Sequence, residues 1–319
     1  MDLGVGKQQL VEIAKALSKN VKLLILDEPT AALNDEDSAH LLDLVRHLRD
    51  DQGVTSIIIT HKLNEVAAIA DNVTIIRDGS TMGEMYITKE TPLDQDELIR
   101  KMVGRELTNL YPEHTPNTPG EEYLRIKDWT VYHPLDPGRI IVDHANISVR
   151  SGEIVGLAGL MGAGRTEMSM SVFGHSYGSS ISGEVYVKGR EVSLPTVQSA
   201  IDAGLAYATE DRKGYGLNLL QNIRENASMA ALKRMSRNGV MDDNIERKEV
   251  ERFRTGFNIK CRDIDVGVST LSGGNQQKVV LAKWVLSDPD VLTLDEPTRG
   301  IDVGAKYEIY ELIIQMAKQ

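Results

Sequence analysis

The chain has 319 residues, 41% hydrophobic and 26% charged, a composition typical of a soluble globular protein with room for two ordinary domains. A net charge of −11 argues against a nucleic-acid partner, because phosphate backbones select basic surfaces. No run approaches the roughly 18 apolar residues of a membrane span, and no charged-then-apolar leader opens the sequence, so we expect a cytosolic location. A single cysteine, Cys261, excludes an intrachain disulfide and a multi-cysteine metal site, and we interpret it as an ordinary buried or half-buried thiol.

One stretch of the sequence occurs twice. Residues 271–277 (LSGGNQQ) are followed, one helix length later, by residues 291–298 (VLTLDEPT). Near the N-terminus, residues 3–9 (LGVGKQQ) and 23–30 (LLILDEPT) repeat the same order. At a constant offset of 268 residues, the 28 aligned positions from 3 to 30 contain 13 identities, far more than chance gives. We interpret this similarity as a duplicated domain.

Each copy joins two elements that act on phosphates. An apolar run that ends in Asp-Glu predicts a buried strand that presents one carboxylate to Mg²⁺ and the next to a water beside a phosphate. The carboxylates are Asp27 and Glu28 in the first copy and Asp295 and Glu296 in the second. The glycine-rich stretch opens a helix, whose backbone N–H groups and positive dipole end face an anion. Together the two elements predict nucleotide chemistry.

The first half alternates between strands and helices. A fully buried strand over 54–60 delivers His61 to the carboxyl end of a parallel sheet, where such sheets bind ligands, and we therefore interpret His61 as catalytic. Hydrophobic periodicity predicts the other elements. They are a helix over 8–17, a strand over 22–26, a helix over 35–48 with Leu41, Leu42, Val45 and Leu48 on one face, a helix over 63–70, a strand over 73–77 followed by a turn at 78–79, and a helix over 93–103.

The second half contains a glycine-rich loop of its own. A strand over 152–158 runs into residues 159–166 (GLMGAGRT), which match the phosphate-loop pattern G-x-x-x-x-G-K-[ST] except that Arg165 replaces the lysine. The arginine keeps the charge, but its planar, bulkier head cannot occupy the same small volume. We therefore expect nucleotide binding without efficient turnover here. A merely structural glycine turn is the alternative interpretation.

The segments between these motifs are predicted to form a linker, further strands and further helices. Prolines 112, 116 and 119 among polar residues predict an inter-domain linker over 104–120. Residues 123–149 read as two alternating strands with a proline-rich loop at 133–138. Further on we predict a charged helical region over 218–265 with main helices at 222–235 and 244–257, then a helix over 271–286, a strand over 291–294 and a helix over 303–316.

These motifs resemble those of the ATP-binding subunits of ABC transporters. Residues 271–277 look like the ABC signature, 159–166 like Walker A, 291–296 like Walker B, 299–302 like the D-loop, and His61 like the switch histidine. The tandem arrangement, Gly-Arg-Thr in the phosphate loop, residues 210–213 (EDRK) and residues 295–305 (DEPTRGIDVGA) look more narrowly like the fused ATPase of bacterial monosaccharide importers of the ribose, galactose and xylose type.

The resemblance implies an α/β fold with two P-loop NTPase domains of the ABC type in tandem. Each domain would contain a mainly parallel sheet with helices, an antiparallel β portion and a helical subdomain. Applied to this sequence, the first domain covers residues 1–104 and lacks its Walker A, residues 105–121 are the linker, and the second domain covers residues 122–319. We expect the intact chain to extend at both ends, and residues 1–319 alone not to hydrolyse ATP normally.

The resemblance also assigns roles, because the two domains of this family close head to tail around ATP and Mg²⁺. In the competent site Asp27 would hold Mg²⁺, Glu28 would polarise the attacking water and His61 would contact the γ-phosphate. The second signature, with Ser272, Gly273, Gly274 and Gln276, would complete that site. A second, degenerate site would combine Gly159, Gly162, Gly164, Arg165 and Thr166 with Asp295, Glu296 and Glu210, and with Gly4 and Gly6 of the altered first signature, and Thr166 and Asp295 would hold its Mg²⁺.

The implied partners are integral membrane permease subunits and, through them, a periplasmic or surface sugar-binding protein, with this subunit peripheral at the cytoplasmic face of the inner membrane. A tandem ABC ATPase acting on ribosomes or nucleic acid is a second possibility, which the short linker, the acidic total and the single cysteine argue against. A nucleotide-binding regulatory module without turnover is a third, which the complete signature and the Asp27 and Glu28 pair argue against. Tyr132 is either a platform for adenine or a core aromatic.

Overall fold

The structure is a computed structural model that describes residues 11–15, 21–30, 33, 35–77, 79–88, 90–104, 111–160 and 162–318. The chain divides into two compact units, the first comprising Met1–Leu110 and the second starting at Tyr111 and containing the rest of the chain apart from Asp302–Gly304. Gly4 and Gly6, and with them the first signature-like stretch, lie outside the described residues.

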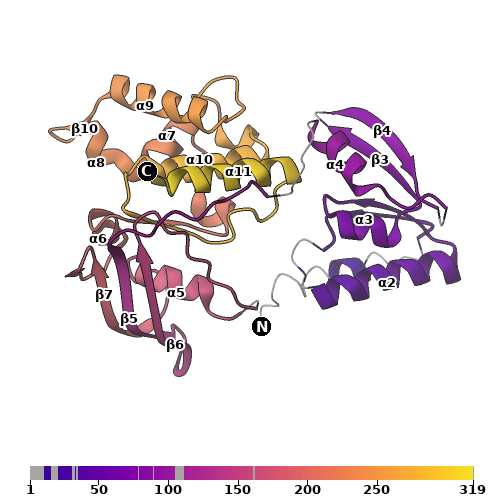
Figure 1. Cartoon of the computed structure of the whole chain (residues 1–319). Helices are drawn as coiled ribbons and strands as arrows, with labels where there is room; N and C mark the ends of the chain where they lie inside the picture. The colour runs from indigo at the N-terminus through magenta and orange to yellow at the C-terminus, as the bar shows by residue number, and fades with distance from the viewer. Residues whose placement is uncertain are drawn as a thin grey trace. The chain divides into compact units, whose positions relative to one another are not determined.

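Unit 1 is built on two parallel strands, β1 (Leu23–Asp27) and β2 (Thr55–Ile59), joined by helix α2 (Asp35–Gln52) (Figure 1). The predicted face of α2, with Leu41, Val45 and Leu48, packs on Leu24 and Leu26 of β1. Helix α3 (Leu63–Ile69), the antiparallel hairpin β3 (Asn72–Arg77) and β4 (Ser80–Tyr86), and helix α4 (Gln95–Val103) follow. The predicted elements of this half from residue 22 onward are confirmed to within a few residues.

One expectation for unit 1 is wrong. The apolar runs predict fully buried strands, yet alternate residues of both strands are exposed. Ile25 of β1 is 61% exposed and Ile57 of β2 is 49% exposed, whereas Leu24 is 3% exposed. The reason is that α2 covers only one face of the β1–β2 pair. Successive side chains of a strand point to opposite faces, so every second side chain faces the helix and the others lie on the uncovered face.

Unit 2 combines a four-stranded antiparallel sheet with a parallel pair of strands. The antiparallel sheet has the order β6-β5-β7-β8 and is dominated by β5 (Glu122–His133), β6 (Asp136–Arg150) and β7 (Ser179–Val187), with the short β8 (Arg190–Glu191) at one edge. The parallel pair is β9 (Leu205–Ala208) and β12 (Val291–Leu294), in register from Leu205 opposite Val291 to Ala208 opposite Leu294. The two strands predicted over 123–149 and the strand predicted over 291–294 are confirmed.

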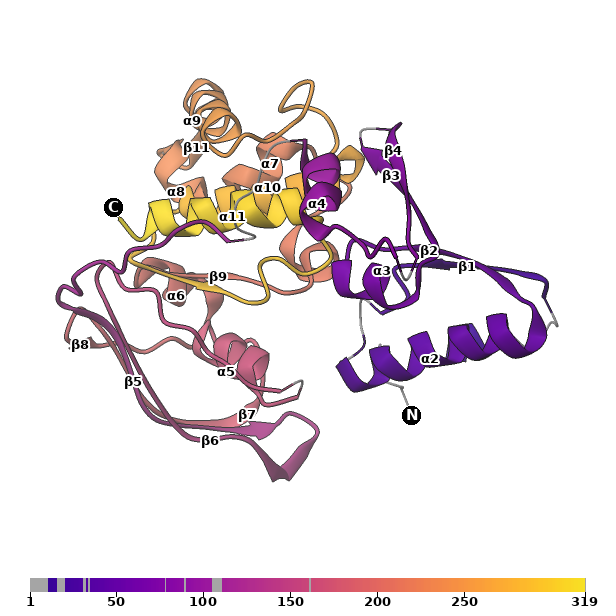
Figure 2. The same cartoon turned by 45° about the vertical axis from the view of Figure 1, so that its right-hand side comes forward.

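Helices cover these strands, and the apolar residues between them form three buried clusters among the described residues. Helix α5 (Arg165–Val172) packs against the antiparallel sheet, where the indole N–H of Trp129 donates to Ser171 Oγ over 2.9 Å. Helix α10 (Gly273–Val285) packs on β9, α7 (Ile223–Ser228) packs on α10, and α9 (Asp243–Gly256) packs on α7 (Figure 2). Helix α6 (Val197–Asp202) precedes β9, and α11 (Val303–Met316) follows β12.

The predicted helix over 222–235 is broken rather than continuous. Helix α7 passes into a single 3₁₀ turn (Met229–Ala231) and then into α8 (Leu232–Met235). A short antiparallel bridge, β10 (Ser236–Arg237) with β11 (Val240–Met241), leads to α9. The interruption lets apolar residues of both parts meet α9, since Ala227, Ala231 and Met235 share a buried cluster with Val250. The predicted helices over 244–257, 271–286 and 303–316 are confirmed.

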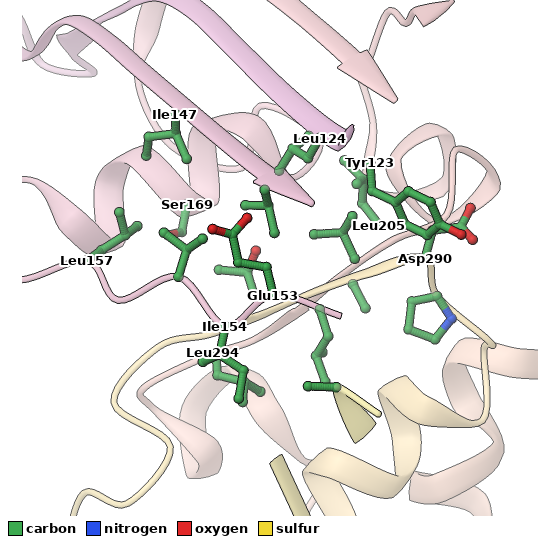
Figure 3. Close-up of a pocket in the computed structure, with 18 of the residues that line it drawn as sticks. Tyr123, Leu124, Ile147, Glu153, Ile154, Leu157, Ser169, Leu205, Asp290 and Leu294 are labelled. Atoms are coloured by element: carbon green, nitrogen blue, oxygen red, sulfur yellow. The ribbon is translucent and has the colours of Figure 1, made fainter. Parts of the chain in front are cut away.

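The strand predicted over 152–158 does not form. Residues 153–158 belong to no helix and no ladder, and Ile154 and Leu157 are 45% and 43% exposed. A cavity of about 660 Å³ lies between this segment and β12, with Leu294, Leu205 and Leu124 among its other lining residues (Figure 3). Ile154, Val155 and Leu157 give this apolar run β-propensity, but a strand also needs a hydrogen-bonding neighbour, and the β9–β12 pair lies across the cavity.

Among the described residues, no helix combines the length and the apolar character that crossing a membrane requires. Cys261 is free and half-buried, as predicted, and burial raises the pKa of its thiol.

Candidate nucleotide sites

The first site lies where β1 and β2 end side by side in unit 1. Glu28 follows β1 in a left-handed conformation, with φ of +44°, and its backbone N–H donates to the carbonyl of Ile59 at the end of β2 over 2.8 Å. The turn brings the Glu28 carboxylate to His61, whose Nδ1 lies 2.9 Å from Oε1. Parallel strands ending at one edge thus place the predicted base and the predicted switch histidine in direct contact.

A second set of contacts lies directly behind this pair, and the sequence analysis missed it. Glu65, at the first turn of α3, is only 2% exposed. Its carboxylate accepts hydrogen bonds from the hydroxyls of Thr30 and Thr60 and forms an ion pair with Lys62. Lys62 Nζ also donates to the carbonyl and hydroxyl oxygens of Thr30, at 3.0 and 2.9 Å.

The second site lies at the end of β12 in unit 2. Glu296 has the same left-handed backbone as Glu28, with φ of +46°, as expected for two copies of one turn. The preceding Asp295 is fixed twice: its N–H donates to the carbonyl of Ala208 over 2.9 Å, and the phenol of Tyr207 donates to its Oδ2 over 2.9 Å. Burial, with the adjacent Asp295 carboxylate, raises the pKa of Tyr207 above its ordinary value, so the phenol stays a hydrogen-bond donor.

The phosphate-loop residues lie next to this strand end. Gly162 and Gly164 both have left-handed backbones, with φ of +80° and +84°, and Gly164 caps the N-terminus of α5. Arg165 and Thr166 therefore open α5, where backbone N–H groups and the helix dipole favour an anion. Arg165 Nη1 lies 3.3 Å from Glu296 Oε1, so the residue that replaces the lysine forms an ion pair with the second carboxylate of the Asp-Glu motif.

One ion pair and two hydrogen bonds hold the segment after β12. Glu210, at the position where the resemblance predicts a glutamine, pairs with Arg299. Arg212 Nη1 donates to the carbonyl of Arg299 over 2.8 Å, and its Nη2 donates to the carbonyl of Gly300 over 3.2 Å. The segment that resembles the D-loop is thereby attached to the turn after β9.

The signature-like residues begin helix α10. Ser272 is the N-cap residue and accepts a hydrogen bond from the side chain of Asn275 over 3.0 Å. Gly274 also has a packing role, since a Cβ there would lie 2.5 Å from Cβ of Ala305 in α11. Gln276 is only 5% exposed and its amide donates to the carbonyl of Val268 over 3.3 Å, so its side chain points into the protein. Tyr132 is half-buried in β5, and both interpretations of it stay open.

The donor atoms at the two sites fit a nucleotide with Mg²⁺. Carboxylate and hydroxyl oxygens, such as those of Asp27, Asp295 and Thr166, are the ligands that Mg²⁺ prefers. The described residues contain no group of three or more His, Cys, Asp or Glu side chains that could hold a metal by themselves.

The fold and the carboxylates at the strand ends are similar to those of ATP-binding cassettes. Residues 142–299 match the family described as ABC transporter. Solved ATP-binding cassettes share the fold. One of an ABC transporter in its ADP conformation has a TM-score of 0.50 and 16% identity, over 62% of this chain and 78% of that one. Another, a dimeric post-hydrolysis state with ADP and Pi bound, has a TM-score of 0.52 and 20% identity, over 61% and 83%.

Closer relatives are ATP-binding proteins of sugar transport. The chain is 58% identical to the L-arabinose transport ATP-binding protein of Geobacillus stearothermophilus over 99% of its own length. It is 48% identical to the xylose import ATP-binding protein of Thermoanaerobacter pseudethanolicus over 98% of its length. In both comparisons the chain spans 61% of the relative. These relatives give no support to the alternative of an ATPase acting on ribosomes or nucleic acid.

Proposed function

We propose that this chain is part of an ATP-binding and ATP-hydrolysing subunit that powers the import of a monosaccharide, a pentose above all, through an ABC transporter. The observation that carries the ATPase proposal is the contact between Glu28 Oε1 and His61 Nδ1, 2.9 Å apart at the carboxyl ends of adjacent parallel strands. A carboxylate held there can accept a proton from an attacking water, and the imidazole fixes its orientation. The relatives named for arabinose and xylose supply the class of cargo.

ATP with Mg²⁺ is the proposed cofactor pair. Asp27 would hold the ion at the first site, and Asp295 with Thr166 would hold it at the second, while the N–H groups at the start of α5 would bind phosphate oxygens. When bound, Mg²⁺ supplies charge neutralisation on the phosphates. The protein groups orient the nucleotide and accept the proton.

The second site is proposed to bind nucleotide and to turn it over poorly. Its carboxylate Glu296 is engaged by Arg165 at 3.3 Å, whereas Glu28 is engaged by a histidine at 2.9 Å. A guanidinium keeps the carboxylate engaged as its ion-pair partner. Because a guanidinium has no acceptor atom, it cannot take up a proton that the carboxylate has received. The tandem arrangement of two ABC domains, with bounds 1–104 and 122–319, and the completion of the first site by Ser272, Gly273 and Gly274 stay predictions from the resemblance.

The proposed partners are membrane permease subunits and, through them, a sugar-binding protein, with the subunit peripheral at the cytoplasmic face of the membrane. The test is the complete protein reconstituted with its permease in vesicles. ATP hydrolysis should rise several-fold when a pentose-loaded binding protein is added, and a non-cognate sugar should leave it at the basal rate. Hydrolysis that no sugar stimulates would contradict the transport proposal, and absence of hydrolysis would contradict the ATPase proposal.

A further inference from the structure

The buried carboxylate of Glu65 has no part in the proposed chemistry, yet it lies directly behind it. A glutamate that is 2% exposed is uncommon, because removing an ionised carboxylate from water costs more than a lone ion pair returns. Burial at such a position is tolerated when several donors satisfy the oxygens. Glu65 has three: the hydroxyls of Thr30 and Thr60 and the ammonium of Lys62.

The three donors come from the two turns that carry the catalytic pair. Thr30 follows Glu28 by two residues in the turn after β1. Thr60 and Lys62 are the two neighbours of His61 in the turn after β2. The backbone N–H of Lys62 also donates to the Thr60 hydroxyl over 3.0 Å, and Lys62 Nζ reaches Thr30. His61 is therefore bracketed by two residues that are both attached to Glu65.

We infer that Glu65 is a positioning residue that locks the turn bearing Glu28 to the turn bearing His61, and so fixes the His61 ring on the Glu28 carboxylate. The backbone bond from Glu28 N–H to the Ile59 carbonyl holds the strands in register, but it leaves the side chains of both turns free to rotate. The Glu65 contacts restrict the backbone on both sides of the imidazole. This inference deepens the proposed function, on which it rests for its relevance to catalysis.

The geometry assigns a proton position that can be measured without nucleotide. A carboxylate only accepts hydrogen bonds, so the ring nitrogen facing Glu28 Oε1, Nδ1, carries a proton. A fixed ring shows one tautomer in ¹⁵N spectra of the imidazole, whereas a released ring exchanges between two. The experiment records these spectra for His61 in the chain of 319 residues, at a pH where free histidine is neutral.

Glu65→Gln keeps the shape of the side chain and removes the charge that holds Lys62, and it should release the ring into tautomer exchange. Thr30→Val removes one donor from a residue that is 1% exposed and should have the same effect, whereas Thr30→Ser keeps the hydroxyl and should keep the single tautomer. Glu36→Gln, an exposed residue of α2, is the matched control for the loss of one charge. If Glu65→Gln fails to fold, the two Thr30 variants decide.

An unchanged Nδ1–H signal in both Glu65→Gln and Thr30→Val would overturn the inference. The kcat of the complete protein distinguishes failure of the proposed function from failure of this inference. In the complete protein, a released ring should lower kcat about tenfold with little change in KM. A released ring with unchanged kcat would leave Glu65 as a positioning residue and remove His61 from the proposed chemistry.

Discussion

Arg165 Nη1 lies 3.3 Å from Glu296 Oε1, and this ion pair takes the place that the contact between His61 and Glu28 has at the first site. The two glutamates have the same backbone conformation, with φ of +46° and +44°. The duplicated turn therefore delivers equivalent carboxylates to different partners. One is a titratable imidazole, the other a permanent cation.

Removing the Arg165 charge should weaken nucleotide binding more than folding. The side chains of Arg165 and Glu296 are 34% and 45% exposed. Ion pairs that are this exposed stabilise a fold by at most about 1 kcal/mol. A guanidinium contact to a phosphate contributes about 1.5 to 3 kcal/mol, so Arg165→Ala should weaken nucleotide binding by about tenfold to a hundredfold. Titration with a fluorescent nucleotide measures this, and Arg165→Lys should retain most of the affinity. Equal affinities of Arg165→Ala and the unaltered chain would refute a phosphate contact.

Arg212 should contribute to the stability of unit 2 through its two hydrogen bonds to the carbonyls of Arg299 and Gly300. These bonds involve a charged donor that is only half-buried, so we expect Arg212→Ala to lower the free energy of unfolding by about 1 to 2 kcal/mol. Urea denaturation measures the change. Arg190→Ala, an exposed arginine in β8, is the control and should change the free energy by less than about 0.5 kcal/mol. If Arg212→Ala and Arg190→Ala had the same free energy of unfolding within error, Arg212 would not secure this segment.

Lys283 predicts a dependence of stability on alkaline pH. The residue is 6% exposed, its ammonium donates to the carbonyl of Gly216, and burial lowers its pKa to about 8 from an ordinary value of 10.5. Between these two values the unfolded chain binds more protons than the folded one, so the free energy of unfolding should rise with pH. The difference between the two pKa values limits the total rise in the free energy of unfolding to roughly 3 kcal/mol.

The measurement is urea denaturation of the chain at pH 8 and at pH 10, compared with Lys283→Met. The methionine variant keeps most of the packing volume and has no group to deprotonate, so its stability should lack the rise due to this residue. The same slope in both proteins would assign the pH dependence to other groups.

Sequence patterns predicted the elements that depend on local periodicity. The apolar face of α2, with Leu41, Val45 and Leu48, was readable because a helix places residues three and four apart on one side. The segment over 152–158 is an apolar run of the kind that forms buried strands, yet it forms no strand, because ladder partners are set by tertiary structure. The open faces of Ile25 and Ile57 were missed for the same reason, since a run of apolar residues does not say how many layers cover it.

At the candidate sites, too, the sequence predicted the residues that belong to a motif and missed those that meet only in the folded chain. Glu28, His61, Asp295 and the glycines stood out by motif, and the structure places them at strand ends and at a helix start. Thr30, Lys62 and Glu65 could not be found this way, because they meet only when two turns 30 residues or more apart are brought together. Tyr207 is similar: a tyrosine in a buried strand reads as core, and only the β9–β12 register aims its phenol at Asp295.

The measurement that tests the central claim most directly compares Glu28→Gln with Glu296→Gln in the complete protein, by steady-state ATP hydrolysis at saturating ATP. If Glu28 is the base of the competent site, Glu28→Gln should reduce kcat by at least about a hundredfold, the usual size of a lost general base. Glu296→Gln should reduce it by less than about threefold, because its carboxylate is bound to Arg165. Equal losses in the two variants, or a larger loss from Glu296→Gln, would contradict a single competent site built on Glu28 and His61.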